Sequence, residues 1–162
     1  RVADIARECG TSTGTVHYHF PTKDDALRAA LTYYADRLHR RLDEAFRTAD
    51  TTVEKLRRLI DVQLPATEDD VHEWSIWVQA WTEAMLDPAQ RPRQRRIYTR
   101  WRRVVLDLVR DQAPDHAEML TSRFTSMVDG LAIQVLAGTT DMSVAGMREV
   151  LLDAFEPYIR LR

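Results

Sequence analysis

The first part of this chain has the pattern of two short helices joined by a tight turn. Four apolar residues recur there at the i, i+3, i+4 and i+7 spacing of a helix and predict one buried stripe: Val2, Ile5, Ala6 and Cys9. Gly10 follows directly and can adopt the positive φ that ends a helix. Ser12 is then placed to cap a second helix, in which Val16 and Phe20 form the inward pair.

The outer face of this second helix is small and hydrogen-bonding, with no long apolar side chain. It consists of Thr13, Thr15, His17 and His19, with Tyr18 beside them. A helix-turn-helix needs a surface of this kind on the helix that enters the major groove of DNA. We therefore predict that double-stranded DNA is a partner of this segment.

Composition limits the remaining possibilities. The chain has 162 residues, of which 44% are hydrophobic and 30% charged, which suits one ordinary domain or a small domain fused to a larger one. Its net charge of −2 means that nucleic-acid binding must come from a local patch. The single cysteine, Cys9, excludes an internal disulfide and is typical of a reducing cytoplasm, where we expect this protein. No apolar run is long enough for a membrane span, so no membrane partner is expected.

The rest of the chain reads as helix after helix, and we predict an all-α fold. Thr22 and Asp25 have the spacing of a capping box before a long helix that runs to about residue 48. We expect two parts, a helix-turn-helix domain with the start of this long helix over 1–46 and a helical effector-binding and dimerisation domain over 47–162. Further helices are predicted from Thr51 or Thr52 to near Pro65 and over 68–86, 90–112, 115–137 and 143–160.

The last two predicted helices carry apolar residues on more than one side. Such helices bury one face in their own core and offer the other to a partner, which indicates a four-helix interface in a two-fold symmetric homodimer. Gly130 costs about 1 kcal/mol in a helix interior, and a close helix–helix approach would explain it. The alternative is that both helices are central in a monomer core. The residues assigned to the interface are Gly130, Ile133, Leu151 and Phe155.

A second candidate site is an aromatic cluster. Trp74, Trp77 and Trp81 have a 3-then-4 spacing, so their indoles line one face of a helix. Large rigid rings suit the wall of a cavity, and their faces attract organic cations. The alternative is a Trp-packed core without a ligand. We expect a hydrophobic or cationic small-molecule effector, and the predicted pocket is completed by Tyr98, Trp101, Phe124 and Met127, with Gln63 and His72 as polar contacts.

No pattern in the sequence indicates an enzyme, a metal site or a cofactor. Cys9 has no obvious base beside it, and the five His lack the spacing of metal ligands. The run 91–103 contains seven Arg and no acid, but these residues flank the apolar stripe of a helix, and we interpret them as a solvated face.

The stretch VADIARECGTSTGTVHYHFPTKDDALRAAL resembles the DNA-binding domain of the tetracycline-repressor (TetR) family of transcriptional regulators. The matching features are Ile5-Ala6, Gly10, the Ser12-Thr13-Gly14 turn, Tyr18-His19-Phe20, Lys23 and Leu27. The segment MVDGLAIQVLAG, residues 127–138, is similar to the ligand-binding part of the choline-sensing branch of that family. One departure is His17, where the family usually has Tyr. The first helix of the family would lie upstream of Arg1.

The resemblance implies roles for the helix-turn-helix residues. Ser12 begins the recognition helix, from which Thr13, Thr15 and His17 would approach bases or the adjoining backbone, while Tyr18, His19 and Lys23 would contact phosphates. It also implies a repressor that a small effector releases from a palindromic operator. Two alternatives are a helical small-molecule-binding protein without specific DNA recognition and a helical-bundle enzyme, which the lack of convergent acid–base residues argues against.

Overall fold

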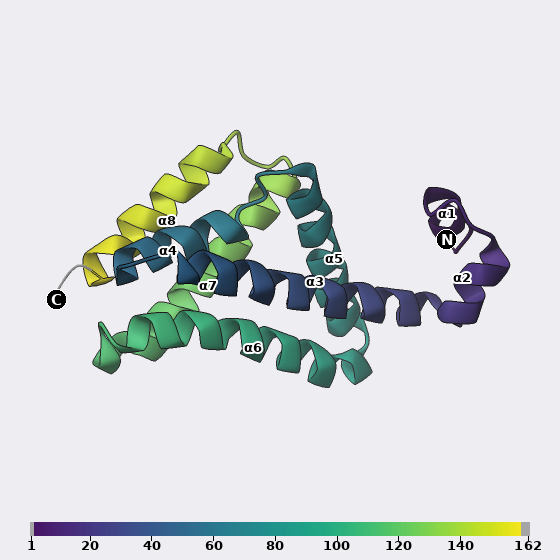
Figure 1. Cartoon of the computed structure of the whole chain (residues 1–162), viewed down its shortest axis with the longest axis horizontal. Coiled ribbons are helices and arrows are strands. Elements are labelled where there is room, and N and C mark those ends of the chain that lie inside the picture. Colours follow the sequence, from purple (N-terminus) through teal and green to yellow (C-terminus); the bar gives the residue numbers. More distant parts are fainter. Residues whose placement is uncertain (1, 160–162) are drawn as a thin grey trace.

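The computed structural model describes residues 2–159, and these form α-helices joined by short turns, without a β-strand among them (Figure 1). The predicted all-α fold is confirmed. The helices are α1 (Val2–Glu8), α2 (Thr13–His19), α3 (Lys23–Arg47), α4 (Thr52–Gln63), α5 (Glu68–Leu86), α6 (Arg91–Arg110), α7 (Ala117–Leu136) and α8 (Val144–Ile159). Two 3₁₀ turns, η1 (Pro88–Gln90) and η2 (Pro114–His116), precede α6 and α7.

Local capping explains where three of these helices begin. The predicted box at Thr22 is present, with its hydroxyl accepting from the Asp25 backbone N–H and the Asp25 carboxylate accepting from the Thr22 backbone N–H. Thr51 rather than Thr52 caps α4, and Thr67 caps α5 in the same way. Each box satisfies backbone donors that the first turn of a helix leaves free. The predicted end of the last helix, residue 160, lies outside the described residues.

One helix, α3, connects the two parts of the molecule. Figure 1 shows α1 and α2 at one end of α3, while α4 to α8 gather around the rest of its length. The main core is built by α3 to α8. A smaller apolar cluster near the beginning of α3 consists of Leu27, Leu31 and Ala80, with Ile76, Trp77 and Ile97 packed against them. Because α3 belongs to both parts, the domain boundary at residues 46 and 47 remains a prediction.

The predicted stripe of α1 is only partly correct. Ala6 is buried and Val2 and Ile5 are half-buried, but Cys9 is exposed. The helix ends at Glu8, and Gly10 adopts a φ of 60°, so the turn carries Cys9 away from the helical face. The prediction that Cys9 is buried is therefore wrong.

The last two helices also differ from expectation. Leu151 is 0% and Phe155 is 3% exposed, and both lie in the core of this chain, so they have no surface for a partner and their assignment to an interface is wrong. The opposite faces of the same helices expose Ile133 of α7 (39%) and Val150 of α8 (38%). A side chain placed on Gly130 would meet nothing within 4 Å. The outer face of α7 is therefore open at Gly130 and Ile133.

Within residues 2–159, none of the helices combines the length and apolarity needed to cross a bilayer.

Candidate functional site

The helix α2 presents a polar outer surface and is held by one apolar anchor. Val16 is buried, whereas all seven residues predicted to contact DNA are exposed: Ser12, Thr13, Thr15, His17, Tyr18, His19 and Lys23. Tyr18 stands out with 83% of its side chain exposed, and its ring meets that of His19 edge-on at 5.2 Å. The surface is therefore free to approach a partner.

Ser12 has a structural role in this surface. Its hydroxyl oxygen accepts a hydrogen bond from the Thr15 backbone N–H at 3.0 Å and lies 2.9 Å from the Thr15 hydroxyl. This is the N-cap that the sequence predicts, and it fixes the start of α2. Lys23 lies at the start of α3, beside the turn that follows α2.

A cavity lies between α3, α4, α5, α6 and α7. Its volume is about 40 Å³. For comparison, a single water molecule needs about 10–15 Å³ of such space. Six of the nine residues predicted for an effector pocket line it: Gln63, Trp74, Trp77, Trp81, Tyr98 and Trp101. The cavity therefore has room for a small ligand among mostly aromatic walls.

The aromatic walls are held in fixed positions. The Trp74 indole N–H donates to the Gln63 backbone carbonyl at 2.9 Å. The Trp81 ring lies 6.3 Å from Trp74 and 6.3 Å from Tyr98, and both contacts are edge-to-face. Such contacts favour a defined orientation of each ring, so the cavity has a rigid wall before any ligand arrives.

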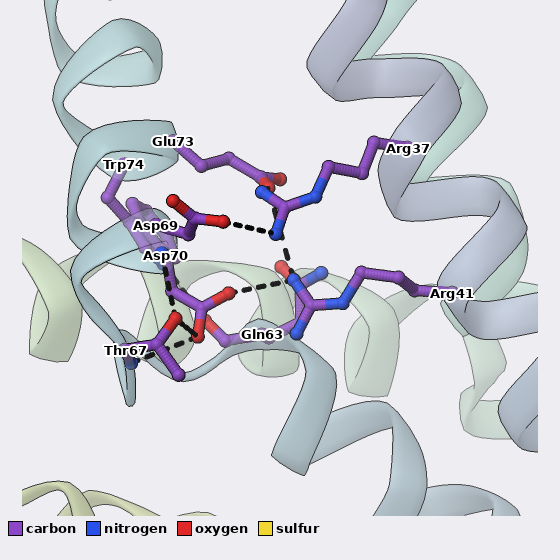
Figure 2. Close-up of polar contacts among 8 residues, drawn as sticks. All are labelled: Arg37, Arg41, Gln63, Thr67, Asp69, Asp70, Glu73 and Trp74. Atoms are coloured by element: carbon purple, nitrogen blue, oxygen red, sulfur yellow. Dashed lines mark hydrogen bonds and ion pairs between the residues drawn. The ribbon is translucent and has the colours of Figure 1, made fainter.

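Acidic side chains of α5 lie beside these rings and connect them to α3 (Figure 2). Asp70 and Glu73 are only 5% and 7% exposed. Arg41 Nη1 lies 2.8 Å from Asp70 Oδ1, and Arg37 Nη1 lies 3.1 Å from Glu73 Oε2. Burial raises the pKa of Glu73, against the lowering effect of Arg37 and then Arg41. Two ion pairs thus link the cavity wall to α3.

A third carboxylate, Asp129, enters the cavity from α7. It accepts a hydrogen bond from the Tyr98 hydroxyl at 2.5 Å. Burial raises the pKa of Asp129 to about 6, although the bond from Tyr98 lowers it. Burial and the neighbouring Asp129 carboxylate also raise the pKa of Tyr98, so the phenol keeps its proton and remains a donor.

Comparison with known families places both parts of the chain. Residues 1–30 match the profile of bacterial regulatory proteins of the tetR family, and residues 52–159 match the C-terminal region of BetI-type transcriptional repressors. The chain belongs to the TetR family of transcriptional regulators. Like other members of this family it is a ligand-responsive, DNA-binding regulator and not an enzyme, and family members bind operators and small effectors and dimerise.

Individual relatives agree with this assignment. The regulator BetI of Brucella melitensis is 28% identical over 85% of this chain and 70% of its own length, and BetI of Agrobacterium fabrum is 25% identical over 98% and 78%. A transcriptional regulator from Saccharomonospora viridis, solved in complex with choline, is 38% identical with a TM-score of 0.87, over 96% of this chain and 84% of that one. A TetR-family structure from Rhodococcus, 24% identical with a TM-score of 0.79 over 98% of this chain and 87% of that one, shares the fold.

Three residues predicted for the pocket do not line it. His72 is exposed because it lies on the outer face of α5. Phe124 is 1% exposed and packs against Trp101 at 6.4 Å and Phe155 at 5.1 Å, which places it in the core behind the cavity wall. Met127 is half-buried against the same core but does not reach the cavity. These three assignments were wrong.

The cavity carboxylates are not among the residues predicted from the sequence, although a signal is present. Asp70 and Glu73 precede Trp74 and Trp77 by four positions each, so they share the helical face of the indoles. Asp70 also belongs to the capping box of α5, in which its carboxylate accepts from the Thr67 backbone N–H. Asp129 had no such neighbour on its own helix. Among residues 2–159, no group of three or more His, Cys, Asp or Glu is arranged to hold a metal ion.

Proposed function

We propose that this chain is a repressor that leaves its palindromic operator when choline, or a quaternary ammonium compound of similar size, fills the cavity. The observation that carries this proposal is that Trp74, Trp81 and Tyr98 line the same cavity as two carboxylates, the buried Glu73 and the half-buried Asp129. A trimethylammonium group donates no hydrogen bond, and aromatic faces with nearby negative charge are the surroundings that hold it.

The similarity to the choline-bound regulator of Saccharomonospora viridis supports the same ligand class. The small volume of the cavity also supports it, since a large planar drug would need the walls to move. The proposed effector site consists of Gln63, Glu73, Trp74, Trp77, Trp81, Tyr98, Trp101 and Asp129.

We propose that α2 enters the major groove of each operator half-site. Thr13, Thr15 and His17 approach the bases, whereas Tyr18, His19 and Lys23 contact phosphates and fix the register. The exposure of this whole face supports the assignment. Lys23 adds a second argument: the helix dipole disfavours a cation in the first turn of α3, and a phosphate opposite it would offset that cost.

The second copy of the chain is proposed to pack on the open outer face of α7 and α8. Gly130 permits a close approach there, and Ile133 and Val150 supply apolar surface. Two-fold symmetry would place two copies of α2 on one face of a palindromic site, one helical turn or a multiple apart.

Effector and operator are coupled through α3 in this proposal. The helix contributes Ala35, Leu38 and Arg41 to the cavity and carries Lys23 at its other end. A ligand in the cavity therefore acts on the same helix that orients α2. A coupling free energy of about 1–3 kcal/mol would suffice to change operator affinity roughly 5- to 150-fold.

The experiment combines two titrations of the full-length protein. Choline should change the Trp fluorescence with a saturable curve, because all four Trp residues line the cavity. Over the same concentrations it should release the protein from a promoter fragment selected for tight binding. Ethanolamine, which lacks the methyl groups, is the matched control ligand. A protein that binds no genomic fragment above random competitor, or whose operator affinity choline leaves unchanged, would refute the proposal.

A further inference from the structure

Asp129 is the cavity carboxylate without a cationic partner among the described residues. Asp70 is paired with Arg41 and also accepts from Thr67, and Glu73 is paired with Arg37. Among residues 2–159, Asp129 accepts a hydrogen bond from the Tyr98 hydroxyl and has no ion pair. The three carboxylates that line the cavity therefore differ, because Asp70 and Glu73 of α5 are paired with arginines of α3 and Asp129 of α7 is not.

The charged groups around Asp129 come from three other helices, and none of them compensates it. From α3, Arg41 is engaged by Asp70, and His39 has its Nδ1 2.7 Å from the Ala35 carbonyl. From α5 come only Asp70 and Glu73. From α6, Arg102 is directed to Ser122, Thr125 and Glu118 of α7, one to three turns before Asp129.

We infer that Asp129 is the specificity-determining residue of the cavity, which accepts a quaternary ammonium ligand whose other end is a hydroxyl and rejects one whose other end is a carboxylate. This inference rests on the proposed function, since it concerns the ligand of the same site.

Both orientations of the ligand lead to the same selection. If the ammonium group lies against the indoles, the other end of the ligand reaches toward Asp129, where a hydroxyl donates a hydrogen bond and a carboxylate meets a like charge. If the ammonium group lies beside Asp129, it supplies the missing counter-charge. A ligand that also carries a carboxylate at its other end has no net charge, so Asp129 and Glu73 no longer attract the ligand as a whole. Between partly buried groups such as these, like charges interact more strongly than in bulk solvent.

The choline site is therefore expected to discriminate between two ligands that share a trimethylammonium group. A hydrogen bond to a charged group, or its replacement by repulsion, corresponds to roughly 10- to 100-fold in affinity. Choline should bind more tightly than trimethylglycine by at least about tenfold at pH 7.5.

The test compares three ligands by Trp fluorescence on the full-length dimer: tetramethylammonium, choline and trimethylglycine. In Asp129→Asn, the ratio of choline affinity to trimethylglycine affinity should fall at least about tenfold, because the amide is uncharged and still fits the space. Tyr98→Phe keeps the carboxylate and should keep the preference. Asp43→Asn removes an exposed carboxylate of α3 outside the cavity and is the matched control, expected to leave all three affinities unchanged.

A second measurement needs no variant. Because burial raises the pKa of Asp129 to about 6, the preference of the wild type for choline over trimethylglycine should decline as pH falls from 7.5 to 5. Glu73 faces the same cavity and has a raised pKa, so Asp129→Asn separates its contribution.

The two proposals fail in different ways. If the wild type binds none of the three ligands, the proposed function fails and takes this inference with it. If it binds tetramethylammonium and choline but the preference is the same in Asp129→Asn and at pH 5, the function stands and Asp129 is not the specificity determinant. A wild type that binds trimethylglycine as tightly as choline also overturns the inference.

Discussion

At the scale of single residues, Asp129 makes the stability of the fold depend on pH. Its pKa is about 6 in the folded chain, compared with an ordinary value of 3.8 for an aspartate. Between these two pH values the folded state holds a proton that the unfolded state has released. The free energy of unfolding therefore decreases as pH rises through this window and stays lower above it. An effector cation would reverse the effect by favouring the charged carboxylate.

Replacing Asp129 should remove this dependence. Between pH 4 and pH 7.5, Asp129→Asn should gain about 2 kcal/mol of unfolding free energy relative to the wild type, from the cost of a buried charge. Urea unfolding at fixed protein concentration and without ligand measures the difference. Equal pH slopes for the two proteins would contradict the assigned pKa shift.

Lys23 gives a second prediction at this scale. Lys23→Gln should weaken binding to all DNA sequences about equally and reduce the slope of log affinity against log salt by about 1, because one phosphate contact is lost. The chain contains one other lysine, Lys55 of α4, which lies outside α2 and the start of α3. Lys55→Gln is therefore the control, and an unchanged salt slope in Lys23→Gln would exclude the phosphate contact.

At the scale of helices, the ion pairs between α3 and α5 are the contacts most directly placed to transmit a change in the cavity. Glu73 belongs to the cavity wall, and its partner Arg37 belongs to the helix that leads to α2. A cation that attracts the Glu73 carboxylate competes with Arg37 for it. The same argument applies to Asp70 and Arg41.

A double-mutant cycle on Arg37 and Glu73 tests this link. Arg37→Gln leaves the buried Glu73 carboxylate with the more distant Arg41 Nη1, at 4.0 Å, and should cost about 1–3 kcal/mol of stability. Part of this loss should be recovered when Arg37→Gln is combined with Glu73→Gln, and the Glu73→Gln single variant completes the cycle. In Arg37→Gln and in the double variant choline should release the operator less than in the wild type. The idea is wrong if the changes in unfolding free energy of the two substitutions are additive and choline still releases the operator as in the wild type. The Arg37–Glu73 pair would then not transmit ligand binding to α2.

The bounds of the helices could be predicted from sequence because they depend on local signals. Capping residues and apolar periodicity lie within a few positions of each helix end, as at Thr22 and Thr51. Where both faces of a helix are apolar, the sequence does not predict which face is buried in the core of the chain. In α8, Val150 and Leu151 are adjacent and both aliphatic, yet packing against α4 and α7 buries only Leu151.

The residues of the candidate site could be predicted where they share one helix, but not where the site depends on a contact between helices. The indoles share one helix and reveal their common face, so Trp74, Trp77 and Trp81 were assigned correctly to one wall. Asp129 comes from α7, and its meeting with Tyr98 of α6 depends on how two helices cross. The periodicity within each helix carries no signal of that crossing.

At the scale of the whole molecule, the proposed packing of a second copy on the open face of α7 can be tested at Gly130. Gly130→Leu fills empty space in the isolated chain and should leave its fold intact, but it should weaken the proposed dimer at least about tenfold by blocking the close helix approach. Analytical ultracentrifugation measures the dissociation constant. Thr99→Leu makes a comparable apolar addition at an exposed position of α6 and is the control. A Gly130→Leu protein that remains dimeric at the same concentrations would place the interface elsewhere.

The uninterrupted helix α3 would carry a tilt at the cavity to α2 in the proposed mechanism. From Arg41 at the cavity to Lys23 beside α2 the helix extends about 27 Å without an interruption, so a tilt of a few degrees at one end displaces the other by about 2 Å. A small ligand could then move the two α2 helices of the dimer out of register with the major grooves of the operator. Replacing Ala29 and Ala30 by glycines would make α3 more flexible between the cavity and α2. Such a protein should still bind choline, but choline should no longer release it from DNA.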